Sequence, residues 1–268
     1  MRSGGNQHHI ILKMGITNLS DREKRRYKRH IMLPEIGEEG QKKLKQAKVL
    51  VIGAGGLGCP VLQYLAAAGV GTIGIVDNDL VQESNLQRQI LYGKNDLGKL
   101  KAIIAKQRLM ELNGLPEYKV LNTYLSKENA LAILGDYDII VDATDNFSSR
   151  YLISDACIIL GKPLVFGAIY KFEGQVSVFN YKGGPSLRCL YPKSSAEGKI
   201  PDASEVGVIG VLPGIIGSMQ ANEVIKIILD KGEILSGKLW VTDILNHRNY
   251  TLKIKTKPEN LKLKKLSL

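Results

Sequence analysis

Strand-like runs alternate with helix-like segments along the first two thirds of the chain. The strand-like runs are short and rich in aliphatic residues, and lie at 48–52, 72–76, 119–124, 138–141 and 163–166. Segments with a helical spacing of apolar positions lie between them, at 57–68, 99–112, 126–135 and 148–160. Strands that alternate with helices in this way predict an α/β fold with a Rossmann-like, doubly wound parallel sheet.

The pattern changes after Gly167. The segment Gln175–Phe179 alternates polar and apolar residues, as a half-exposed strand does. A helical pattern at 215–229 precedes two further strand-like segments at 238–242 and 250–255. We therefore expect a sheet that is parallel in its first half and mixed or antiparallel in its C-terminal part.

Both ends of the chain differ from the middle. Charged residues with scattered apolar positions predict an N-terminal helical extension up to residue 48, broken near Pro34 and Gly37. The expected organisation is a flexible extension at 1–20, a single domain at 21–256 with a long crossover loop at about 180–207, and a loose basic tail at 257–268.

The composition is ordinary for a soluble protein. Of the 268 residues, 44% are hydrophobic and 24% are charged, and no apolar run approaches the ~20 residues of a membrane span. The first residues lack the apolar core and cleavage site of a signal peptide, and three cysteines form no disulfide framework. We therefore expect a cytoplasmic protein.

The net charge of +11 has three readings. Nucleic-acid binding, attraction to an acidic protein partner or a polyphosphate, and a solvated, lysine-rich surface each account for such an excess. Much of the charge lies at 22–29, 42–48 and 253–265. We expect a solvated surface for most of it, and neither a nucleic acid nor a membrane as partner.

The segment VLVIGAGGLG at 49–58 is the first candidate for chemistry. Gly53, Gly55, Gly56 and Gly58 follow a strand and precede a helix, so the loop aims backbone N–H groups and a helix dipole at an anion. The alternative interpretation of the same sequence is a glycine-rich surface turn. The flanking elements, with Asp77 about 20 residues on, favour nucleotide binding, for which an NAD-dependent dehydrogenase is the default interpretation.

Acidic residues end the second strand. Asp77 is placed to accept hydrogen bonds from ribose hydroxyls, or else to cap a turn. Asp79 is either a second polar contact or a turn-forming residue.

A cluster rich in hydrogen-bond donors follows. It consists of Ser84, Asn85, Leu86, Gln87, Arg88 and Gln89. Arg88 brings a planar guanidinium suited to phosphate oxygens, and Lys101 adds a point charge, although each alone is typical of a protein surface. Together they favour a triphosphate over a nicotinamide.

The segment DATDN, Asp142–Asn146, follows the strand at 138–141. Ligands of open parallel sheets gather at this carboxyl edge. Mg²⁺ takes one or two protein carboxylates together with phosphate oxygens, so Asp145 is a candidate ligand, although it is equally placed to cap the next helix. Asp142, nearer the apolar strand, is expected to be structural.

These motifs together resemble one family, the MoeB/ThiF/HesA adenylyltransferases, which are relatives of the ubiquitin-activating enzymes. The matching segments are RYKRH from Arg26, GAGGLG from Gly53, VDND from Val76, SNLQRQ from Ser84, DATDN from Asp142, FGAIYKFEGQVSVF from Phe166 and GVLPGIIGSMQANE from Gly210. They occur in the family's order and cover nearly the whole chain.

The resemblance implies a reaction and its partners. Such enzymes use ATP and Mg²⁺ to activate the C-terminal glycine of a ubiquitin-like sulfur-carrier protein that ends in Gly-Gly. The carboxylate attacks the α-phosphate, pyrophosphate leaves, and an acyl-adenylate forms. Chemistry of this kind depends on positioning and on fixed positive charge. The resemblance also implies a homodimer.

The resemblance implies residue roles as well. Gly56 would contact the nucleotide, Asp77 would hold the ribose, and Asp145 would bind Mg²⁺. Arg29 matches an arginine that the family lends across a dimer interface, although the sequence alone favours an ordinary surface arginine. The phosphate contacts would be Asn85, Arg88 and Lys101, and the site would be completed by Gly53, Gly55, Gly58, Asp79, Ser84, Leu86, Gln87 and Asn146.

The cysteines depart from the family pattern. Members often carry two C-x-x-C pairs that bind a structural zinc, which here fall at Ser186–Cys189 and Lys257–Asn260. Only Cys189 remains of the four thiolates that such a site needs, so we expect no zinc. Ala203 replaces the cysteine of the crossover loop, so sulfur would have to come from an external donor.

Three other functions remain open. The lost cysteines fit a module that binds a carrier or a nucleotide without catalysis, although the retained charged residues argue against it. An NAD-dependent dehydrogenase predicts nicotinamide binding. Adenylation of a peptide or of an RNA-linked carboxylate is the third. The motifs do not select among molybdopterin, thiamine and other sulfur pathways.

Overall fold

One eight-stranded sheet organises the chain in a computed structural model that describes residues 18–192 and 207–266. The strand order is β3-β2-β1-β4-β5-β6-β7-β8. The strands are β1 (Lys48–Ile52), β2 (Thr72–Val76), β3 (Glu117–Leu121), β4 (Ile139–Asp142), β5 (Leu164–Tyr170), β6 (Glu173–Phe179), β7 (Lys238–Asp243) and β8 (Arg248–Lys253). Pairs from β3 to β5 are parallel and pairs from β5 to β8 are antiparallel, which confirms the expected fold class.

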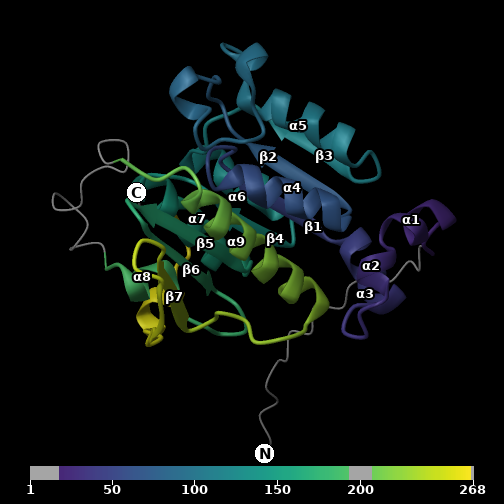
Figure 1. Ribbon diagram of the computed structural model, residues 1–268. Helices are drawn as coiled ribbons and strands as arrows, with labels where there is room; N and C mark the ends of the chain where they lie inside the picture. The colour runs from purple at the N-terminus through teal and green to yellow at the C-terminus, as the bar shows by residue number, and fades with distance from the viewer. Residues whose placement is uncertain (1–17, 193–206, 267–268) are drawn as a thin grey trace, which may run out of the picture.

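Helices cover both faces of the sheet (Figure 1). They are α1 (Asp21–Arg26), α2 (Lys28–Ile31), α3 (Gly37–Gln46), α4 (Gly58–Ala68), α5 (Lys101–Leu112), α6 (Lys127–Gly135), α7 (Phe147–Leu160), α8 (Leu187–Leu190) and α9 (Leu212–Leu229). Short 3₁₀ turns are η1 (Glu83–Asn85), η2 (Lys94–Asp96) and η4 (Pro258–Leu261). Helices α4, α5 and α9 lie on one face, and α6 and α7 lie on the other (Figure 1).

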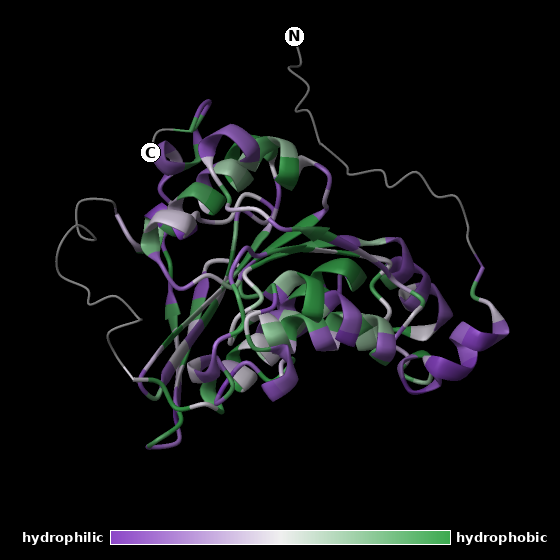
Figure 2. Ribbon diagram, turned by 90° about the horizontal axis from the view of Figure 1, so that it is seen from above, coloured by the Kyte–Doolittle hydropathy of each residue, from purple (hydrophilic) through white to green (hydrophobic). Residues whose placement is uncertain are grey.

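The alternation of side chains along β1 explains the two layers. Val49 and Val51 join the core that contains α4 and α9, whereas Leu50 and Ile52 join the core that contains α6 and α7. Because successive side chains of a strand point to opposite faces, an all-apolar strand must be covered on both. Figure 2 shows the largely hydrophobic strands between two layers of helices.

The N-terminal helices lie far from the carboxyl edge of the sheet. Helix α3 ends just before Lys48, the first residue of β1, and a Cβ on Gly40 of α3 would touch Leu229 at the end of α9. The start of α9 lies at the glycine loop, where a Cβ on Gly56 would be 3.2 Å from Pro213. The 18 residues of α9 separate these two ends by about 27 Å.

Several boundaries differ from the expected ones because tertiary pairing decides them. Strand β3 begins at Glu117, two residues early, because its partner β2 begins opposite at Thr72. The strands at 163–166 and 175–179 extend into a hairpin that turns at Lys171, whose φ is 52°. The expected crossover loop contains α8 before the structure's gap at 193–206, and Ala203 lies outside the described residues.

The C-terminal segment is packed rather than loose over its described part. Pro258–Leu261 forms a 3₁₀ turn, and the carbonyl oxygen of Asn260 accepts a hydrogen bond from Ser186 Oγ at 3.3 Å. Leu266 packs against the core on the α7 face. Residues 257–266 are therefore held to the domain at these points, although most of them are exposed.

None of the helices in the described parts of the chain combines the length and the apolarity that a membrane span requires.

Candidate functional site

A pocket of about 290 Å³ opens at the carboxyl ends of β1, β2 and β4. Its walls come from the loops that follow these three strands and β3, from the first turns of α5 and α7, and from the β5–β6 turn. This is the edge at which open parallel sheets bind ligands. Of the residues predicted from the sequence, it is lined by Gly53, Gly55, Gly56, Asp77, Asp79, Arg88, Lys101, Asp145 and Asn146.

The glycine loop needs its glycines for two different reasons. Gly53 has a φ of 96°, in the left-handed region, and a Cβ there would lie 2.6 Å from the carbonyl oxygen of Ala143. A Cβ on Gly58 would collide with the carbonyl oxygen of Gly53, so the first turn of α4 packs directly on the loop. Gly58 itself does not line the pocket. The loop thus presents backbone N–H groups and the N-terminus of α4, which suit a phosphate.

Asp77 supports the glycine loop. Its carboxylate accepts hydrogen bonds from Ala54 N at 2.7 Å and from Asp79 N at 2.8 Å. Burial raises the pKa of Asp77 above its ordinary value, although these two bonds and the charge of Lys101 lower it. Each carboxylate oxygen retains a lone pair, so the side chain can also accept hydroxyl donors from a ligand.

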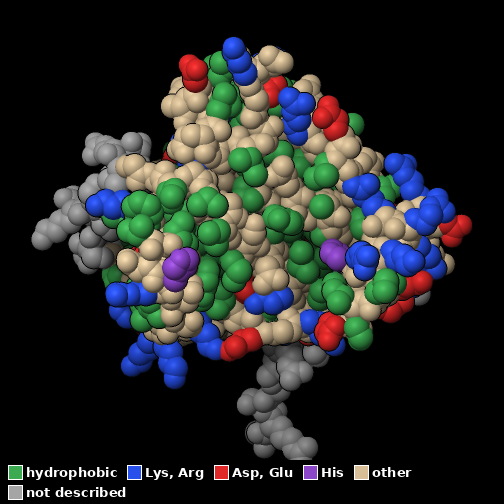
Figure 3. Space-filling model, in the orientation of Figure 1, with side chains coloured by type: hydrophobic (Ala, Val, Ile, Leu, Met, Phe, Trp, Pro, Cys, Tyr) green, Lys and Arg blue, Asp and Glu red, His purple; other side chains and the backbone are tan. Residues whose placement is uncertain are grey.

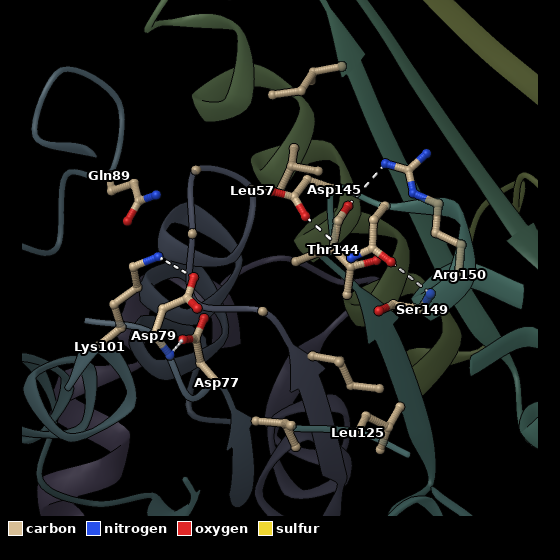
Figure 4. Close-up of a pocket in the computed structure, with 18 of the residues that line it drawn as sticks. Leu57, Asp77, Asp79, Gln89, Lys101, Leu125, Thr144, Asp145, Ser149 and Arg150 are labelled. Atoms are coloured by element: carbon tan, nitrogen blue, oxygen red, sulfur yellow. Dashed lines mark hydrogen bonds and ion pairs between the residues drawn. The ribbon is translucent and has the colours of Figure 1, made fainter. Parts of the chain in front are cut away.

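A buried lysine lies on the same side of the pocket as Asp77 (Figure 4). Lys101 Nζ lies 2.8 Å from Asp79 Oδ2, and the lysine side chain is only 7% exposed, whereas that of Asp79 is 65% exposed. The backbone N–H of Lys101 also donates to the carbonyl oxygen of Asp79, at 2.9 Å. Figure 4 shows this pair on one side of the pocket and Thr144, Asp145, Ser149 and Arg150 on the other. The pocket therefore holds a fixed cation that an anionic ligand can reach.

The donor-rich segment contributes two side chains to the pocket, those of Arg88 and Gln89. Arg88 lines the wall and donates from Nη1 to the carbonyl oxygen of Ser84 at 3.1 Å, which holds the guanidinium in place. Asn85 is buried and accepts a hydrogen bond from Gln82 N at 3.1 Å, so it shapes the η1 turn. Neither Ser84, Asn85, Leu86 nor Gln87 lines the pocket, so these four residues support the turn that carries Arg88.

The DATDN segment divides into a structural and an accessible carboxylate. Asp142 is fully buried and accepts from Thr144 N at 2.9 Å and Thr144 Oγ1 at 2.6 Å, as expected of a structural residue. Burial raises its pKa above the ordinary range. Asp145 is exposed in the pocket, and its one hydrogen bond within 18–192 and 207–266 is accepted from Asn146 Nδ2 at 3.5 Å. Asn146, not Asp145, caps α7, because its side chain accepts from Ser149 N at 2.9 Å.

The donor set suits a magnesium ion that is brought by a nucleotide. In the described ranges, no three His, Cys, Asp or Glu side chains are grouped to hold a metal. One free carboxylate on Asp145 is what Mg²⁺ needs when phosphate oxygens and water supply its other ligands. The site therefore fits Mg²⁺ only together with a polyphosphate.

Arg150 lines the pocket and was not among the residues predicted from the sequence, whereas Gln89 belongs to the donor-rich segment but had been given no role there. Arg150 is 8% exposed, donates to the carbonyl oxygen of Thr144 at 3.0 Å and stacks on Phe147 and Phe166. Its Nε and the side-chain oxygen of Gln89 are buried without a hydrogen-bond partner. Arg150 sits one turn into α7, and helical side chains lean toward the N-terminus, so its position after DATDN was the available signal.

Arg29 does not reach the pocket of its own chain. It is exposed on α2, at the α3 end of α9, whereas the pocket lies at the other end. The separation of about 27 Å along α9 is several times the length of an arginine side chain.

The similarity to known proteins agrees with the motifs. The family model described as "ThiF family" matches residues 27–263. A sulfur carrier protein adenylyltransferase of Thermus thermophilus is 50% identical over 238 residues, 87% of this chain and 88% of that protein. A probable molybdopterin-synthase adenylyltransferase of Porphyra purpurea is 54% identical over 222 residues, 82% of this chain and 58% of that protein.

Solved structures show the same fold. The crystal structure of MccB of E. coli with ATP has a TM-score of 0.78 and 22% identity, over 89% of this chain and 73% of that one. The family expected from the motifs is confirmed, and so is the expected class of enzyme, an adenylyltransferase. The chain belongs to the ThiF family.

Proposed function

We propose that this chain adenylylates the C-terminal glycine of a ubiquitin-like sulfur-carrier protein at the expense of ATP. A carboxylate oxygen of the carrier attacks the α-phosphorus of ATP and forms a new O–P bond. The bond from that phosphorus to the oxygen bridging the β-phosphate breaks, and its electron pair leaves with pyrophosphate. The product is a carrier acyl-adenylate.

The pocket can orient ATP for this attack. The glycine loop and the N-terminus of α4 would hold phosphate oxygens, and Asp77 at the end of β2 would accept the ribose hydroxyls. Lys101 and Arg88 would bind the phosphates that leave, because both cations lie in the pocket and are held by Asp79 and by Ser84 respectively.

The main barrier is the approach of one anion to another. Fixed cations reduce this repulsion without reorganising during the reaction. Asp145 would hold Mg²⁺, which neutralises phosphate charge and polarises the α-phosphate. Arg150 donates to Thr144 and stacks on two aromatic rings, so it would offer a further fixed positive charge in the pocket.

We further propose that the active form is a homodimer whose interface includes the α4–α9 face. Figure 3 shows hydrophobic side chains gathered over the middle of this face and Lys and Arg side chains over α1–α3 at one end. Exposed hydrophobic residues include Met32, Tyr64, Val211 and Ile215. A two-fold axis through the middle of α9 would exchange its ends, and so carry Arg29 of one copy to the pocket of the other.

One observation carries the proposal: the glycine loop, Asp77, Arg88, Lys101 and Asp145 line a single pocket. A dehydrogenase that binds NAD has no use for a buried lysine, an arginine and an isolated carboxylate around the phosphates. A non-catalytic binding module does not need the exposed Asp145. Since no described cysteine lines the pocket, we propose that an external donor supplies sulfur to the adenylate.

The test is carrier-dependent exchange of labelled pyrophosphate into ATP. A carrier ending in Gly-Gly should support exchange, and the same carrier without its last glycine should not. Exchange that is equally fast with both carriers, or that needs no carrier, would refute the proposed substrate. Exchange driven only by a short free peptide would favour the peptide alternative.

A further inference from the structure

Two pairs of positions that lie far apart in the sequence meet beside α8. They are Ser186, Cys189, Lys257 and Asn260, at which the family pattern places the cysteines of a structural zinc site. Ser186 is fully buried at the start of α8. Lys257 directly precedes the η4 turn, and Asn260 lies within it. The structure thus brings together the positions of both lost C-x-x-C pairs.

The contacts among the four residues centre on one sulfur atom. Cys189 Sγ lies 3.5 Å from Ser186 Oγ, 3.4 Å from the backbone N of Lys257 and 3.9 Å from Nδ2 of Asn260. Ser186 Oγ also donates to the carbonyl oxygen of Asn260 at 3.3 Å. Three hydrogen bonds therefore link Ser186 and Cys189 to the C-terminal segment.

These distances are similar to those between neighbouring ligand atoms in a tetrahedral zinc site. Zn–S bonds of about 2.3 Å in a tetrahedron place neighbouring sulfurs roughly 3.8 Å apart. The hydroxyl of Ser186 and the amide of Asn260 lie at similar distances from Cys189 Sγ. However, one thiol, one hydroxyl, one amide and one lysine do not make a zinc site, because zinc sites use Cys, His, Asp or Glu ligands. The residues do not fit the metal.

We propose that Ser186, Cys189, Lys257 and Asn260 form a metal-free cluster, here called the C-terminal clip. Its hydrogen bonds attach residues 257–266 to α8, in place of the zinc ion that other family members use. The hydrogen bonds supply the cross-link between segments that the metal supplies elsewhere. The proposal concerns stability and not the adenylylation reaction, so it stands or falls separately from the proposed function.

The clip fastens the tail to an element that reaches the pocket. Arg188 of α8 forms two hydrogen bonds to buried Asp155 of α7, at 2.8 and 2.6 Å. Helix α7 begins beside the pocket and carries Arg150. The clip therefore joins the C-terminal segment to the helix that forms one pocket wall, and it would keep that wall in place without dependence on metal supply.

The first test is metal content and chelator sensitivity of the full chain. The protein purified from cells grown with added zinc should contain far less than one zinc per chain, and EDTA should leave its melting temperature unchanged. Stoichiometric zinc, or a melting temperature that EDTA lowers, would overturn the proposal.

The second test restores the thiols. The triple variant Ser186→Cys, Lys257→Cys and Asn260→Cys should bind zinc stoichiometrically and should melt at a lower temperature in EDTA. Such a gain would show that the four positions surround a metal-sized space. A triple variant that folds, as judged by circular dichroism, and binds no zinc would overturn this geometry.

The third test breaks the clip with single substitutions. Cys189→Ala and Asn260→Ala should each lower the melting temperature by roughly 2–4 °C and speed amide hydrogen exchange at 257–266. Glu259→Ala is the matched control, because Glu259 is exposed in the same turn. Exchange at 257–266 that is unchanged in both clip variants would refute the role of the hydrogen bonds.

Discussion

The location of Arg29 leads to a quantitative prediction about the dimer. Arg29→Ala should abolish carrier-dependent pyrophosphate exchange, and so should Asp145→Ala, because each removes a group that the proposed site needs. Arg29 lies toward the α3 end of α9 and Asp145 lines the pocket at the other end; the 18 residues of α9 span about 27 Å, so one chain cannot bring its own two groups together. If Arg29 acts across the interface, each inactive variant carries the group that the other lacks.

A heterodimer of the two variants should therefore recover activity. One of its two sites contains both Asp145 and the partner's arginine, and the other site contains neither. Relative to the parent dimer, about half of the exchange activity should return. The heterodimer can be isolated by giving the two chains different affinity tags and purifying on both in turn.

The control places both substitutions on one chain. When the double variant is paired with a parent chain, one site lacks Arg29 and the other lacks Asp145, so this heterodimer should be inactive. Arg25→Ala, on the exposed surface of α1, should leave exchange at the parent rate. The reasoning fails if the heterodimer of the two single variants is inactive and the heterodimer of the double variant with the parent is active. That outcome would mean that Arg29 acts within its own chain. It also fails if Arg29→Ala retains parental activity.

Three further predictions concern the pocket and the fold. Lys101→Ala removes a buried cation and should weaken ATP binding by roughly 10- to 100-fold in calorimetry, since hydrogen bonds to charged groups contribute about 1.5–3 kcal/mol; Lys94→Ala is the control, and equal affinities for both variants would contradict the assignment. Gly58→Ala should lower the free energy of unfolding in urea by about 1–3 kcal/mol, because its Cβ would strike the carbonyl of Gly53, whereas Gly135→Ala, which meets no atom, should change it little. Asp142→Asn should become more stable relative to the parent as pH rises from about 4 to about 7. Burial raises the pKa of Asp142 in the folded state above its unfolded value, so the free energy of unfolding of the parent falls as pH rises, whereas asparagine does not titrate. Urea titrations at both pH values measure the difference, and a relative loss would contradict the sign.

Local elements of the fold were predictable from the sequence, and pairing-dependent ones were not. The strand Lys48–Ile52, the glycine loop and the helix after it follow from apolar spacing and from glycine chemistry, both of which are local. The end of the strand at Phe166 was misjudged because Gly167 resembles a turn. Its backbone instead continues opposite Val176, and a Cβ there would strike Gln220 of α9, so packing and not turning requires the glycine.

The site divides in the same way. Motif spacing identified Asp77, Arg88 and Lys101, and the structure places all three in one pocket. The ion pair of Lys101 with Asp79 joins residues on different elements, so no local pattern contains it. Arg150 was missed because its neighbours in the helix have no motif of their own. The hydrogen bonds of the C-terminal clip could not be predicted from the sequence, because its two halves lie about 70 residues apart and meet only in the folded chain.

Direct detection of the acyl-adenylate tests the central claim most directly. The purified chain is incubated with ATP, Mg²⁺, pyrophosphatase and a carrier that ends in Gly-Gly, and the intact mass of the carrier is measured. We predict that the carrier gains one adenylyl group with the parent enzyme and remains unmodified with Asp145→Ala. A carrier that stays unmodified with the parent enzyme while ATP is cleaved to ADP and phosphate would contradict the account.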